Sequence, residues 1–71
     1  MHILSKTEAV LAYRLALAGV SYAEAELAEA GLTGSPGRIR EAQRELQLRQ
    51  FIKDQALADL FVATRAKRAA A

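Results

Sequence analysis

The chain has 71 residues, of which 52% are hydrophobic and 25% are charged, and its formal net charge is +2. This length predicts a single domain, 1–71, close to the size at which small proteins need a disulfide, a metal or a second copy for stability. There is no cysteine, so disulfides are excluded, and the one histidine, His2, cannot close a structural zinc site. We therefore expect no metal or cofactor, and oligomerisation remains as the source of extra stability. The richness in alanine, leucine, glutamate and arginine predicts an all-α protein.

The first predicted helix covers about 5–19. Ser5 and Glu8 have the spacing of a capping box, in which each side chain accepts a hydrogen bond from the other residue's amide. Gly19 is placed to end this helix in the left-handed conformation, which glycine adopts without strain.

The second predicted helix covers about 21–31, because the same two devices recur. Ser21 and Glu24 form another capping-box pattern, and Gly31 is placed as another helix stop. The first two helices are thus predicted to be short.

The third predicted helix covers about 35–67, with Ser35 as N-cap and Pro36 at the first helical position. At about 1.5 Å per residue it would be about 50 Å long, whereas a compact globule of this size has a radius of gyration of about 11 Å. A helix of this length indicates a helical-bundle homodimer or another partner.

The apolar stripe of this third helix changes face in its middle. Ile39, Ala42 and Leu46 share one face, but Lys53 falls on that face further along. Either the helix breaks near Lys53 and four short helices form a compact monomer, or it stays whole and packs one face against the first helix of its own chain and the other against a second chain. We favour the continuous helix, because residues 47–55 include no helix breaker.

The apolar residues at the face switch are Leu48, Phe51 and Ile52, which point away from the first face. A cluster of this kind on a small protein predicts an interface. It serves either self-association into a homodimer or the binding of another protein, with Phe51 as its anchor. Its predicted rim is formed by Arg44, Arg49 and Gln55.

Catalysis finds little support in this composition. A nucleophile and a base must meet in a cleft, and the chain offers no cysteine, no internal histidine, and carboxylates on the surfaces of amphipathic helices. We expect a protein that is not an enzyme and has no catalytic residues.

DNA binding is the alternative function. Two helices joined by a glycine-containing turn are typical of a helix-turn-helix regulator, whose second helix enters the major groove, although the turn here is about two residues too long. The residues that would contact bases or phosphates lie at the start of the third helix: Ser35, Arg38, Arg40 and Arg44.

Localisation is predicted to be cytoplasmic. The apolar stretch from Ala9 to Val20 is interrupted by Arg14, which argues against a secretory signal. No segment has 18 uninterrupted apolar residues, so a membrane span is not expected.

In size, lack of catalytic groups and alanine-, arginine- and leucine-rich composition, the chain resembles small helical proteins that phages make to inhibit host regulators, such as quorum-sensing anti-activators. The resemblance implies a dimer that sequesters a transcription factor or another host protein by direct contact. It carries no motif, so it assigns no functional residue.

Overall fold

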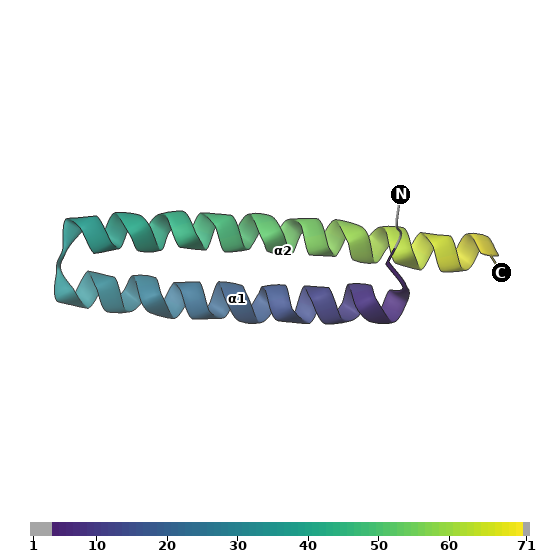
Figure 1. The fold of residues 1–71 in the computed structure, drawn as a ribbon, viewed down its shortest axis with the longest axis horizontal. Helices are drawn as coiled ribbons and strands as arrows, with labels where there is room; N and C mark the ends of the chain where they lie inside the picture. The colour runs from purple at the N-terminus through teal and green to yellow at the C-terminus, as the bar shows by residue number, and fades with distance from the viewer. Residues whose placement is uncertain (1–3, 71) are drawn as a thin grey trace.

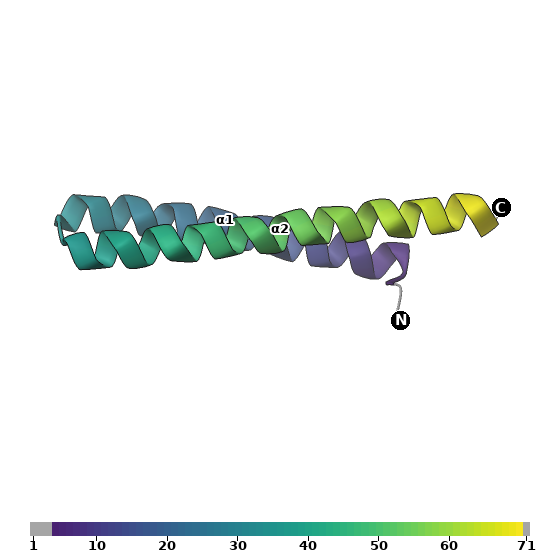
Figure 2. The same cartoon turned by 90° about the horizontal axis from the view of Figure 1, so that it is seen from above.

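The computed structural model describes residues 4–70, and side chains from Leu4 to Arg65. In this range the chain consists of two α-helices and no strand: α1, Lys6–Thr33, and α2, Pro36–Ala70. The helices lie side by side and antiparallel, as a hairpin (Figure 1), and their axes cross at a shallow angle (Figure 2). The all-α prediction is confirmed, and His2 lies outside the described residues.

The start of α1 forms as its sequence predicts. The Ser5 hydroxyl accepts a hydrogen bond from the Glu8 amide, and the Glu8 carboxylate accepts one from the Ser5 amide, each at 3.1 Å. This capping box satisfies two of the amides that a helix start leaves without an intrahelical partner.

The prediction of two short helices before the long one was wrong. α1 runs through both Gly19 and Gly31 without a break, and ends only at Gly34, whose φ of 73° is the one positive φ among the described residues. The Gly34 amide donates to the Ala30 carbonyl at 3.2 Å, and the Thr33 hydroxyl donates to the same oxygen at 2.9 Å. These bonds close the last turn of α1.

Packing against α2 explains why α1 continues through its middle. A helical glycine costs about 1 kcal/mol relative to alanine, and a helical serine costs less. A break there would lose several backbone hydrogen bonds, each with a net value of about 0.5–1.5 kcal/mol. It would also remove Val20 and Ala23 from the helix contact, where both are buried. The favourable terms exceed the cost of Gly19 and Ser21.

The long helix α2 is continuous, as favoured from the sequence, and does not break near Lys53. It begins at Pro36, and the Ser35 carbonyl accepts the first helical hydrogen bond, from the Ile39 amide at 3.0 Å. The last turns of α2 extend beyond the start of α1 (Figure 1).

Alanine lines the contact between the two helices at intervals of seven residues. We call these positions the alanine seam; its members are Ala9, Ala16, Ala23 and Ala30 of α1, and Ala42, Ala56 and Ala63 of α2. All of them are buried except Ala42, which is half-buried. A seven-residue repeat is two helical turns, so it keeps one side of each helix against its neighbour when the pair supercoils. Small side chains at the repeat let the two backbones approach closely.

The resulting hairpin is a thin rod. Its principal extents are 54 × 18 × 13 Å and its radius of gyration is 15.9 Å, against about 11 Å for a compact chain of this length. One dimension is close to the diameter of a single helix with its side chains. The rod therefore has no second layer that could cover its faces.

Candidate protein-binding surface

The three apolar residues at the face switch of α2 form an exposed cluster, which we call the outer patch: Leu48, Phe51 and Ile52. Their side chains are 53%, 61% and 45% exposed. They surround Arg49, which lies in the line of the alanine seam, seven residues after Ala42 and seven before Ala56. At 100° per residue, Phe51 is rotated by about 200° from that line, and so faces away from α1.

The three predicted rim residues have different surroundings. Arg44 and Gln55 are exposed, as a rim requires, whereas Arg49 is half-buried between the helices. A Cβ atom placed on Gly19 would lie 3.1 Å from Nη1 of Arg49 and 3.4 Å from its Cδ. Nε of Arg49 also donates to Oε1 of Glu45 at 2.8 Å. Gly19 thus provides the space in α1 that the Arg49 side chain fills.

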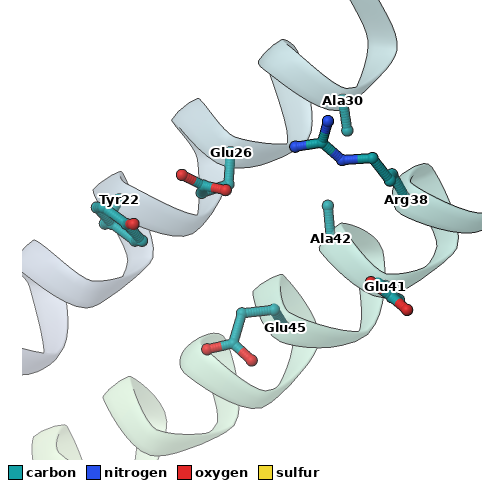
Figure 3. A pocket seen from close by; sticks show the side chains of 7 residues that line it. All are labelled: Tyr22, Glu26, Ala30, Arg38, Glu41, Ala42 and Glu45. Carbon is teal, nitrogen blue, oxygen red and sulfur yellow. The ribbon is translucent and has the colours of Figure 1, made fainter. Parts of the chain in front are cut away.

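The residues predicted to contact DNA do not all share one face: Arg40 and Arg44, four residues apart, are neighbours on α2, whereas Arg38 lines a cleft beside α1. Ser35 is half-buried at the turn, while Arg38, Arg40 and Arg44 are exposed. Arg38 lies in a cleft between the helices near the turn (Figure 3). The residues that line this cleft are Tyr22, Glu26 and Ala30 of α1, and Arg38, Glu41, Ala42 and Glu45 of α2. The lining holds three carboxylates and one guanidinium, and the Glu45 carboxylate is paired with Arg49. A balance of about one negative charge remains at this cleft, which disfavours phosphate.

The arrangement of the helices also differs from that of a helix-turn-helix. In that motif the two helices meet at about 90–120°, so that the second can enter the major groove while the first crosses the backbone. Here α1 and α2 run antiparallel over their shared length (Figures 1 and 2). The start of α2 therefore lies beside the end of α1 instead of projecting from it.

Sequence reasoning missed the exposed apolar side chains of α1. Leu11, Leu15 and Tyr22 are 54%, 73% and 63% exposed. The seven-residue spacing of alanine from Ala9 to Ala30 is the pattern that could have identified the contacting side. It leaves the leucines on the other sides of α1 outside the contact.

No chemical centre is evident among residues 4–65. Their aspartate and glutamate side chains form no group of three that could hold a metal ion. Neither helix, over its described residues, is long and apolar enough to cross a membrane. What the described surface offers is exposed apolar side chains beside charged ones.

Comparisons of this chain with protein families, with curated proteins and with solved structures find no match. Its functional assignment therefore depends on its own residues and geometry.

Proposed function

We propose that this protein is a small, non-catalytic regulatory protein that acts by binding another protein, such as a transcriptional regulator, and that it does so as a homodimer. The observation that carries the proposal is the outer patch, three large apolar side chains on one side of a continuous helix. Binding to a partner would remove these side chains from water, at about 25 cal/mol for each Å² of apolar surface buried.

The structural setting of the outer patch suits protein binding. α2 is an uninterrupted helix, so the backbone that carries Leu48, Phe51 and Ile52 is already ordered, and binding restricts only their side chains. An exposed helix face of this kind fits an apolar groove on a partner, with residues three and four apart as anchors. Phe51 is the central aromatic side chain, and we propose it as the residue that contributes most to binding.

The proposal is tested by affinity capture from the native host, followed by reconstitution with the purified partner. We expect Phe51→Asp to weaken binding of the purified partner at least about tenfold, because a charged group would replace the anchor of an apolar contact. Leu32→Asp is the matched control, since Leu32 is 89% exposed near the turn, away from the outer patch. Equal affinity of the partner for wild type and Phe51→Asp would contradict the assignment of the patch.

DNA binding through Ser35, Arg38, Arg40 and Arg44 is the alternative proposal, supported by the exposure of the three arginines. Its test is a titration of duplex DNA at several salt concentrations. Phosphate contacts make affinity fall steeply as salt rises, so a DNA-binding protein would bind tightly at low salt. Absence of binding at low salt would remove this alternative.

A further inference from the structure

The buried core of the hairpin lacks large side chains. Its buried hydrophobic residues are six alanines and Val20, and no leucine, isoleucine, phenylalanine or tyrosine from residue 4 to residue 65 is fully buried. A buried methyl group contributes about 0.8 kcal/mol, whereas a fully buried leucine or phenylalanine contributes about 1.5–3 kcal/mol. Among residues 4–65, ten large apolar side chains are between 40% and 89% exposed in the single hairpin.

Large apolar side chains collect along one flank of the alanine seam. On each helix they stand one or four residues after a seam position, about 100° and 40° from it. Phe61 stands five residues after Ala56, about 140° from it, so all are rotated from the seam in the same sense. We call this flank the broad face, and represent it by Tyr13, Leu17 and Leu27 of α1, and Leu46, Leu57 and Phe61 of α2. Four of these are half-buried, while Leu17 and Phe61 are 40% and 60% exposed.

The two helices are antiparallel and face each other along the seam. Side chains that are rotated from the seam in the same sense on each helix therefore lie on the same side of the hairpin. The cleft of Figure 3 lies on the opposite flank, where side chains are rotated from the seam in the other sense, and its lining agrees with this geometry. Tyr22 directly precedes Ala23, Glu41 directly precedes Ala42, and both side chains line the same cleft. Leu48 likewise precedes the seam position of Arg49. The outer patch therefore belongs to the cleft side and the back of α2, away from the broad face.

The exposed area matches what a second copy would cover. The accessible surface of the chain is 5532 Å², whereas a compact monomer of 7.7 kDa exposes about 4,300 Å² by the scaling of surface with mass. The difference, about 1,200 Å² over the whole rod, has the size of one partner's share of an obligate homodimer interface, which is about 1,000–2,500 Å².

The charge of the broad face also permits self-association. From Val10 to Thr64, the positions one and four residues after the seam carry only two charged residues, Glu24 and Lys53, which have opposite signs. The positions five residues after the seam, where Phe61 lies, add Arg14 and Asp54, which also have opposite signs. Two copies of the face therefore meet without a like-charge excess. A face built equally by two helices can pack on its own copy across a two-fold axis.

We propose that a second copy of this chain packs on the broad face, so that two hairpins form a four-helix bundle and the outer patch stays free for the foreign partner. This inference deepens the proposed function, on which it rests for the role of the outer patch. Within the bundle, the half-buried side chains of the broad face form the core that the alanine seam alone does not provide.

The test uses two phenylalanines of α2 with nearly equal exposure, Phe61 at 60% and Phe51 at 61%. Sedimentation equilibrium of the purified protein should give twice 7.7 kDa for wild type and for Phe51→Asp. Phe61→Asp should halve that mass, because it places a carboxylate on the face that the second copy covers. A monomeric wild type, an intact Phe61→Asp dimer, or dissociation caused by Phe51→Asp alone would each overturn the proposal.

Lys53→Leu provides a second test of the bundle. It decides between the outcomes if Phe61→Asp unfolds, or if Phe51→Asp and Phe61→Asp both dissociate. Replacing this cation by leucine in the broad face should lower the dimer dissociation constant by about tenfold or more. Arg44→Leu, on the opposite side of α2, should leave the constant unchanged. An unchanged dissociation constant in Lys53→Leu would overturn the bundle.

These measurements test the bundle separately from the proposed function. They use the pure protein, so failure to find a foreign partner does not affect their result. A monomeric protein that still binds a partner through the outer patch would contradict the bundle and not the role of the patch.

Discussion

The beginning of α1 and its midpoint carry the same local sequence pattern with opposite outcomes. Ser5 and Glu8 form a capping box with both hydrogen bonds in place, whereas Ser21 and Glu24 have the same spacing but lie inside the helix. Before Ser5 there is no helical segment to continue, while Ser21 follows a residue that is buried against α2. A capping pattern starts a helix only where no tertiary contact favours continuing the previous one.

Of the substitutions that test this comparison, Tyr22→Pro should cause the largest change in the free energy of unfolding. If a helix began at Ser21, Tyr22 would be its first residue, where proline is tolerated. In the continuous α1, Tyr22→Pro removes a backbone hydrogen bond and clashes with the preceding turn, so we expect a loss of about 3 kcal/mol or more in the free energy of unfolding. Urea unfolding followed by circular dichroism measures it, with Tyr22→Ala as control for the lost side chain. A loss below about 1 kcal/mol would mean that the helix breaks there.

Alanine at the two glycines near the turn should change stability in opposite directions. Gly34 has a φ of 73°, so Gly34→Ala should lower the free energy of unfolding by about 1 kcal/mol. Gly31 is helical, and a Cβ atom added there meets nothing within 4 Å, so Gly31→Ala should raise it by about 0.8–1 kcal/mol. Thermal and urea unfolding measure both. Destabilisation by Gly31→Ala would indicate that a helix ends at Gly31, as the sequence alone predicted.

The two serines of the repeated capping pattern should also separate. Ser5→Ala removes the hydroxyl that accepts from Glu8 and should lower the free energy of unfolding by about 1 kcal/mol. Ser21→Ala replaces an exposed helical serine and should raise it by a few tenths of a kcal/mol, since alanine has the higher helix propensity. Urea midpoints of the two variants decide the comparison. Equal losses would show that both boxes act as caps.

The smallest effect is expected where Arg49 meets Gly19. Gly19→Ala gains up to about 1 kcal/mol of helix propensity but displaces the Arg49 side chain, so its net effect in wild type should stay within about 0.5 kcal/mol. In the Arg49→Ala background the same substitution should stabilise by the full amount. A double-mutant cycle measures this coupling, and additivity of the two substitutions would show that Gly19 provides no space for Arg49.

The sequence alone determined the features that depend on neighbouring residues. The all-α class, the capping box at Ser5, the start of the last helix at Pro36 and its continuity past Lys53 follow from local propensities and hydrogen bonds. The exposure of Leu48, Phe51 and Ile52 was also predictable, because the unrolled helix places them off the face of Ile39 and Leu46.

Only the tertiary structure decided which glycine ends α1 and what Arg49 does. Gly19, Gly31 and Gly34 each satisfy the local rule for a stop, and the choice depends on the burial of Val20, Ala23 and Ala30 against a helix that follows in the chain. Arg49 was predicted as a rim residue because its own helix gives no indication of the space at Gly19. The physical reason is that the alanine seam joins residues far apart in sequence, and its packing energy exceeds the cost of about 1 kcal/mol for a glycine inside a helix.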